Sequence, residues 1–235
     1  MTMASKTLLK SILMVLTFIV FSSSVQASHS AGGSVSAEYL GQDQYKITAT
    51  VHWYIPTMTG SYGLVVSVCG SGSVIMTMDS VRTLNGVCGA ATYEFTHSAV
   101  ITLLTVPVSG CEIEVYTASN VCCMENSNTI STGMALAYYM RIFPGSKLNG
   151  VGSSPNFTVP FIKYYVQSPS MKYCLNAYDT DAYDSLYYEL DEPFGNYETY
   201  RTGFSISHPF GDTLTTVLNP NTGVLTSQSP NLNIW

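Results

Sequence analysis

Charge is scarce in this chain. Only 10% of its 235 residues are Asp, Glu, Lys or Arg, and nine basic residues stand against fifteen acidic ones. A chain with so few and scattered basic residues lacks the positive patch that nucleic acids and anionic lipid surfaces require. The sequence therefore predicts no nucleic-acid partner, and a surface whose solubility depends on hydroxyl groups, amides and glycine.

Sequence patterns of catalytic and metal sites are also missing. There is no C-x-x-C pair, the four histidines are scattered, and no G-x-S-x-G nucleophile elbow occurs. Glu112 and Glu114 are spaced to share one face of a strand, and glycoside hydrolysis uses two carboxylates, but exposed charges on a strand have the same spacing. We expect a protein that is not an enzyme.

After residue 27 no stretch has apolar residues at helical spacing. Apolar and polar residues alternate instead. Along Tyr45–Tyr54, one face holds Tyr45, Ile47, Ala49, Val51 and Trp53, and the other holds Lys46, Thr48, Thr50 and His52. Such alternation is typical of a half-buried strand, and the abundance of Tyr, Thr, Val and Ser also favours strands. We predict an all-β fold built from Ig-like or cadherin-like β-sandwich units.

The first 27 residues are typical of a secretory signal peptide. Lys6 and Lys10 precede an apolar run from Ile12 to Phe21, and small residues lead to a predicted cleavage after Ala27. The run is too short to span a bilayer comfortably. We therefore expect a secreted or cell-surface protein that does not span the membrane after cleavage. Lys6 and Lys10 are the only charged residues that cleavage removes, so the mature chain keeps seven basic and fifteen acidic residues, a net charge of −8.

Six cysteines follow the predicted cleavage site: Cys69, Cys88, Cys111, Cys122, Cys123 and Cys174. An even number in an exported chain predicts three disulfides, whose pairing the sequence leaves open. Two of the six, at positions 122 and 123, are adjacent and cannot easily bridge each other. Each of them is expected to pair with a cysteine elsewhere.

A segment rich in Gly, Ser, Asn and Pro, Phe143–Pro155, separates two groups of predicted strands. We place a domain boundary there, between a disulfide-bonded sandwich at 28–150 and a second Ig-like or cadherin-like unit at 151–235. The second unit is short for a seven-stranded sandwich, so we expect it to be incomplete at its C-terminal end. Its unpaired edge would accept a strand from a partner.

Five motifs follow one another along the chain in a recognisable order. They are Gly32-Gly33 with Glu38-Tyr39-Leu40-Gly41, the segment Cys111 to Cys123, Ser153-Ser154-Pro155-Asn156-Phe157, the run Asp179 to Leu190 after Cys174, and Asn219-Pro220-Asn221-Thr222-Gly223. Together they resemble the N-terminal region of secreted or cell-surface proteins of Bacteroidota that carry PKD repeats and a gliding-motility-associated sorting domain. The chain departs from that pattern at Trp53-Tyr54-Ile55-Pro56, where the family has a cysteine.

The resemblance implies export by the Sec route, type IX secretion, and a role in adhesion or matrix binding. We accordingly expect a non-enzymatic exported module that binds a surface polymer, a glycan or a protein ligand. Two alternatives remain, namely a carbohydrate-binding module and a structural subunit completed by strand donation from a partner.

The closely spaced carboxylates of Asp179, Asp181 and Asp184 are the candidate metal site. Calcium prefers several oxygen ligands, and cadherin-like modules place such runs in loops. The spacing does not match an EF-hand, because its glycine position is Asp184 and its last position is Leu190. The alternative is a polar turn in which the carboxylates accept hydrogen bonds from backbone amides. Calcium is the only cofactor that the sequence suggests.

Tyrosines and hydroxyl residues supply the other candidates. Tyr187 and Tyr188 lie among acidic and amide residues, an arrangement suited to sugar stacking, although cross-strand packing uses the same rings. Ser80, Ser185 and Thr213 each follow an aspartate and precede an apolar residue. This pattern resembles the acceptor of O-linked glycans in Bacteroidota, so we predict glycosylation at one or more of the three residues.

Overall fold

The computed structural model describes residues 30–53, 63–69, 72–87, 90–117, 137–143, 152–158, 170–180, 185–191, 200, 202–209 and 216–228. Every regular element in these ranges is a β-strand, which confirms the predicted all-β class. The predicted signal peptide lies outside the described residues. The first eight strands are β1 (Ser30–Gly41), β2 (Gln44–Trp53), β3 (Leu64–Val68), β4 (Gly72–Ile75), β5 (Thr77–Val87), β6 (Ala90–Thr102), β7 (Cys111–Thr117) and β8 (Ala137–Ile142).

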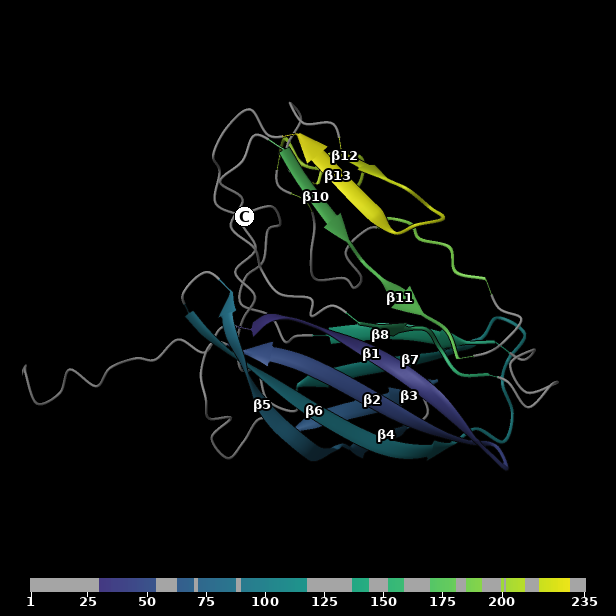
Figure 1. The fold of residues 1–235 in the computed structure, drawn as a ribbon. Coiled ribbons are helices and arrows are strands. Elements are labelled where there is room, and N and C mark those ends of the chain that lie inside the picture. Colours follow the sequence, from purple (N-terminus) through teal and green to yellow (C-terminus); the bar gives the residue numbers. More distant parts are fainter. Residues whose placement is uncertain are drawn as a thin grey trace, which may run out of the picture.

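These eight strands form two antiparallel sheets, in the orders β1-β2-β6-β5 and β4-β3-β7-β8. Figure 1 shows the first sheet in front of the second. The chain changes sheet between β2 and β3, returns at the corner residue Met76 between β4 and β5, and changes again between β6 and β7. The result is a β-sandwich, as the sequence predicted.

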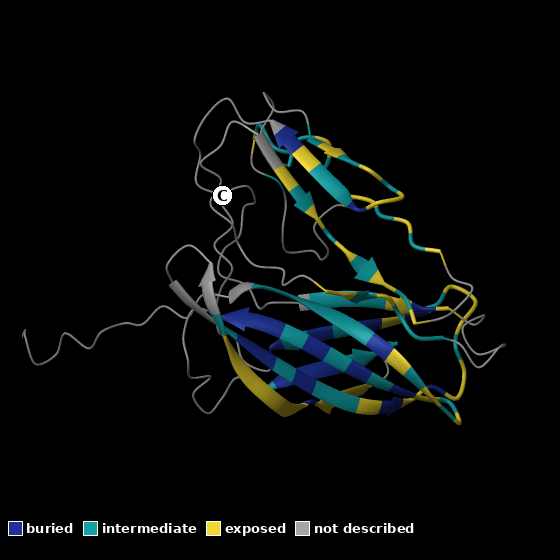
Figure 2. Cartoon of the chain, viewed as in Figure 1, coloured by how far each residue is buried: buried dark blue, intermediate teal, exposed yellow. Residues whose placement is uncertain are grey.

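The core lies between the two inner faces. From β2 it receives the predicted apolar side chains, of which Tyr45, Ile47, Ala49 and Val51 are fully buried. The facing sheet contributes a matching set of fully buried residues, Leu64, Val66, Cys111, Ile113 and Val115. Figure 2 shows this burial as dark blue bands along the central strands. Alternation along β2 therefore correctly identified the core face.

One disulfide joins neighbouring strands of the second sheet. Cys69 follows β3 directly, Cys111 begins β7, and their Cα atoms are 4.9 Å apart. The amide of Cys69 also donates to the carbonyl of Glu112 over 2.8 Å. Cys174 is exposed and is not bridged to another described cysteine. Cys88, Cys122 and Cys123 lie outside the described residues, so three bridges remain a prediction.

Strands β1 and β8 close one side of the sandwich. Gly33 of β1 lies so near β8 that a Cβ atom there would overlap the hydroxyl of Tyr138 and the carbonyl oxygen of Thr50. The connector after β8 then covers the free edge of β1. The amide of Ala37 donates to the Ser154 hydroxyl over 2.8 Å, and the Ser154 amide donates back to the Ala37 carbonyl over 2.7 Å.

The remaining strands form smaller sheets. They are β9 (Asn156–Phe157), β10 (Ser170–Cys174), β11 (Ala177–Tyr178), β12 (Thr216–Leu218) and β13 (Val224–Gln228). One sheet has the order β10-β13-β12 and the other pairs β11 with β9. In Figure 1 the three-stranded sheet lies above the sandwich. The domain boundary near residue 150 stays a prediction, because residues 144–151 lie outside the described residues.

Gly33→Ala should destabilise the sandwich by about 1–3 kcal/mol, because the added methyl group has no room between β1 and Tyr138. Thermal unfolding followed by circular dichroism measures the effect. Gly72→Ala is the matched control, since a Cβ at Gly72 meets no atom within 4 Å. Equal melting temperatures for both variants would contradict this account of the closed edge.

Removing the Cys69–Cys111 bridge should also lower stability. The Cys69→Ala/Cys111→Ala variant is expected to lose about 2–4 kcal/mol, because the bridge restricts the unfolded chain. Chemical denaturation of the oxidised protein and of the variant measures the difference. A melting temperature that is the same with and without reductant would argue against a stabilising bridge.

Candidate functional site

The outer face of the β1-β2-β6-β5 sheet carries two rows of hydroxyl side chains. Cross-strand pairing places them in the rows Ser34–Thr50–Thr96–Ser80 and Ser36–Thr48–Ser98–Thr77. We call these eight residues the hydroxyl face. Neighbouring strands lie about 4.8 Å apart and alternate residues of one strand about 6.7 Å apart, so the hydroxyls form a regular array. Ser80 and Thr77 at the β5 end are exposed, and the other six are half-buried.

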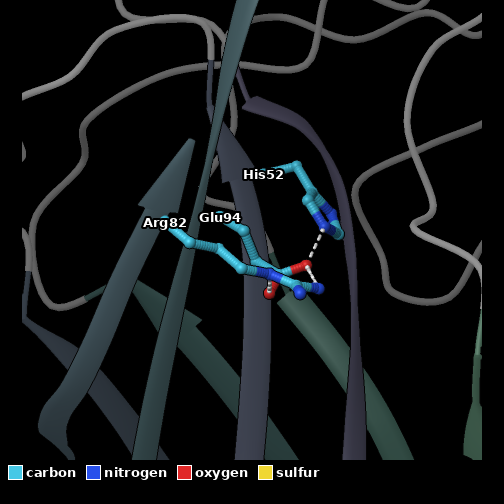
Figure 3. A network of polar contacts seen from close by, with 3 residues as sticks. All are labelled: His52, Arg82 and Glu94. Atoms are coloured by element: carbon cyan, nitrogen blue, oxygen red, sulfur yellow. Dashed lines mark hydrogen bonds and ion pairs between the residues drawn. The ribbon is translucent and has the colours of Figure 1, made fainter. Parts of the chain in front are cut away.

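A row of charged residues borders the hydroxyl face. His52 of β2, Glu94 of β6 and Arg82 of β5 stand opposite one another on three adjacent strands. His52 Nε2 lies 3.0 Å from Glu94 Oε2, and Arg82 holds the same carboxylate through Nε and Nη2 (Figure 3). His52 is 2% and Glu94 is 8% exposed, whereas the Arg82 side chain is 66% exposed.

The ionisation of this row follows from its burial. Burial acts to raise the pKa of Glu94, but hydrogen bonds from Arg82 and His52 outweigh it and hold that pKa below its ordinary value. Burial lowers the pKa of His52, although its bond to Glu94 opposes the shift. His52 is therefore neutral near pH 7 and donates its Nε2–H to the ionised carboxylate. Arg82 supplies the positive charge that balances Glu94.

A second buried histidine lies on the opposite face of the sheet. His97 of β6 pairs with Ala49 and Met78, points into the core and is 4% exposed. Its Nδ1 atom is buried without a hydrogen-bond partner among the described residues. Burial lowers the pKa of His97, and the charge of Asp79 opposes that shift only in part. The core therefore holds this imidazole in its neutral form.

Only part of the predicted calcium site is described. Asp179 is half-buried and follows β11, while Asp181 and Asp184 lie outside the described residues. Among the residues that the structure describes, no three His, Cys, Asp or Glu side chains are arranged to hold a metal ion. The calcium site therefore stays a prediction.

The two candidate tyrosines have different surroundings. The Tyr187 side chain is exposed, whereas Tyr188 is half-buried, and its hydroxyl accepts a hydrogen bond from the Ala177 amide over 3.1 Å. The Tyr188 ring packs on Gly223, where a Cβ atom would lie 2.7 Å from the ring. Gly223 also has a φ of +65°, which favours glycine. Of the pair, Tyr187 is the more exposed to solvent.

Tyr188 also secures the turn between β12 and β13. Its amide donates to the Pro220 carbonyl over 2.9 Å. Within the turn, the side chain of Asn219 accepts hydrogen bonds from the amides of Asn221 and Thr222. The Asn-Pro-Asn-Thr-Gly sequence is thus a self-capped turn.

The remaining sequence candidates lie on several different surfaces. Ser80 is exposed in β5 and Ser185 is exposed between β11 and β12, while Thr213 lies outside the described residues. Glu112 and Glu114 share the outer face of β7, as predicted. Glu114 accepts a hydrogen bond from the Tyr139 hydroxyl over 2.9 Å, and Glu112 lies 3.9 Å from Arg141.

The row of His52, Glu94 and Arg82 was not predicted. The alternation of β2 placed His52 on the outer face, but the partners come from strands that follow much later in the chain. Only the pairing of β2 with β6 and of β6 with β5 brings the three together. The sequence signal that could have indicated this row is the presence of two charged residues, Glu94 and Arg82, inside strands of a chain with few charges.

Comparison of the chain with protein-family models, curated proteins and solved structures finds no match. The described residues contain no helix that is long and apolar enough to cross a membrane.

Acidification should destabilise the fold. The unfolded chain protonates its histidines near their ordinary pKa of 6.5, while the folded protein keeps His52 and His97 neutral to lower pH. Below pH 6.5 the unfolded state therefore binds more protons, and the free energy of unfolding decreases. The fold also lowers the pKa of Glu94 from 4.5, so protonation of this carboxylate at more acidic pH decreases the free energy of unfolding further.

Chemical denaturation at a series of pH values from about 7.5 to 5.5 measures this slope. His97→Leu should flatten it, because leucine fills the core position without binding a proton. An unchanged slope in the variant would show that His97 does not contribute.

Proposed function

We propose that this chain is a non-enzymatic exported module for adhesion or ligand binding at the cell surface or in the secreted medium. The observation that carries the proposal is the hydroxyl face, an ordered array of eight uncharged donors and acceptors on one side of a disulfide-bonded sandwich. Such a face is suited to hydrogen bonding with a polar polymer, since each hydroxyl both donates and accepts.

The topology supports the same proposal. Sheet orders of β1-β2-β6-β5 and β4-β3-β7-β8 correspond to the A-B-E-D and C′-C-F-G orders of immunoglobulin-type sandwiches. We infer an Ig-like unit on this basis. It differs from antibody domains, because its Cys69–Cys111 bridge joins neighbouring strands of one sheet instead of spanning the two sheets.

Export is also part of the proposal. The bridge between Cys69 and Cys111 is typical of an oxidising compartment outside the cytosol. Together with the sequence of the first 27 residues, it supports a secreted or surface location.

Carbohydrate binding is the second candidate, and one observation favours it. Tyr187 is 71% exposed, so its ring is available to stack on a sugar. In that case Tyr187→Ala should abolish glycan binding. Variants of the hydroxyl face should leave it intact.

The test is a binding panel with the mature chain, residues 28–235. Immobilised cellulose, chitin, peptidoglycan, collagen and fibronectin are the probes. We expect saturable retention on at least one of them, with affinity about tenfold lower for Thr50→Ala/Thr96→Ala, because two hydrogen bonds are lost. Thr102→Ala/Thr222→Ala is the matched control, since both threonines are exposed and lie outside the hydroxyl face.

Retention that is unchanged in the Thr50→Ala/Thr96→Ala variant would remove the hydroxyl face from the binding surface. Lack of retention on every probe would contradict the adhesion proposal. Release of soluble fragments from a polymer would contradict the non-enzymatic part of the proposal.

A further inference from the structure

The edges of the sandwich are protected unequally. On one side, the connector covers the edge of β1 through Ser153 and Ser154, whose hydroxyls accept hydrogen bonds from the amides of Tyr39 and Ala37. Strand β8 lies against the same side, with Tyr138 at Gly33. Sheet edges are usually covered in this way, because their free N–H and C=O groups otherwise pair with another strand.

Among the described residues, none covers the opposite edge, which is formed by β4 and β5. Between residues 72 and 83, every described side chain is exposed except the corner residue Met76. Figure 2 shows the exposed part of β5 in yellow at the margin of the front sheet. Within the described part of the chain, β5 pairs with β6 alone. Its outward N–H and C=O groups therefore form an open edge for strand addition.

Core-facing side chains are also left partly uncovered along this edge. Val81 pairs with the buried Phe95 and Met78 pairs with the buried His97, so both point toward the core side of the sheet. Yet Val81 is 44% exposed and Met78 is 52% exposed. An added strand beside β5 would cover both side chains and pair the free backbone groups. Only another extended strand does both.

We propose that β5 pairs in antiparallel orientation with β5 of a second copy of this chain. A two-fold axis at Val81 joins the two sheets into one eight-stranded sheet. This register places Val81 opposite Val81 of the second copy and Ser80 opposite Arg82. Asp79 is the extra residue of a bulge where β5 pairs with β6, and we place it in a bulge here as well. Met78 of one copy then lies opposite Thr83 of the other, on the core side of the sheet.

Charge favours a second copy as the occupant. The edge from residue 72 to 83 has only two charges, Asp79 and Arg82, and they are of opposite sign. In the proposed register the exposed guanidinium of Arg82, while it holds Glu94 of its own copy, lies next to Asp79 of the other copy, so each edge complements itself. No like charges stand opposite each other, although the mature chain as a whole carries −8. This proposal is independent of the proposed function.

Sedimentation equilibrium of the mature chain across the micromolar range tests the pairing. The wild type is expected to be a monomer–dimer mixture. Val81→Lys should raise the dissociation constant at least tenfold, because two lysines would then face each other at the axis. Val100→Lys is the matched control, since Val100 is 54% exposed in the same sheet but lies on β6 outside the stretch that pairs with β5. It should dimerise like the wild type.

Asp79→Lys is a second variant, which keeps the test valid if Val81→Lys does not fold. Residue 79 is an exposed position in a bulge, so the fold should tolerate the change, while the new lysine would repel Arg82 of the second copy. Weaker dimerisation is expected, with an unchanged circular dichroism spectrum. A monomeric wild type at every concentration would overturn the proposal. A dimer that both Val81→Lys and Asp79→Lys leave intact would also overturn it.

Discussion

The pairing of β2 with β6 is the constraint on which the rest of the structure depends. Its register, from Gln44 opposite Thr102 to Trp53 opposite Tyr93, runs without a break through the middle of the front sheet. Side chains alternate between faces, so this single register sends one set of residues into the core and the other outward. The same pairing thus builds the hydrophobic core, aligns the hydroxyl face and brings His52 to Glu94.

The buried charge row shows what this arrangement requires. A carboxylate that is 8% exposed would be costly alone, but Glu94 has Arg82 and His52 as partners. The guanidinium reaches it from the exposed side, so the positive charge stays hydrated while the carboxylate is covered. Burial that keeps His52 neutral leaves the row with one negative and one positive charge near neutral pH. The sheet therefore carries a polar row without a net charge.

Local patterns were sufficient for some of these features and insufficient for others. Alternation identified the core face of β2, because side-chain direction in a strand depends only on the parity of the position. It could not show that Glu94 stands opposite His52, since that depends on register between strands 42 residues apart. Tyr187 and Tyr188 look alike in sequence, and the contacts of Tyr188 with Gly223 and Ala177 distinguish them. Asp181, Asp184 and Thr213 lie outside the described residues, so their roles stay predictions.

The most direct test is to measure the register in which β2 pairs with β6. Nuclear Overhauser effects between backbone protons across β2 and β6, measured by NMR on the mature chain, report which residues stand opposite each other. We predict contacts of Thr50 with Thr96 and of His52 with Glu94. Contacts displaced by one residue would contradict it, because a shift of one position turns the hydroxyl face toward the core.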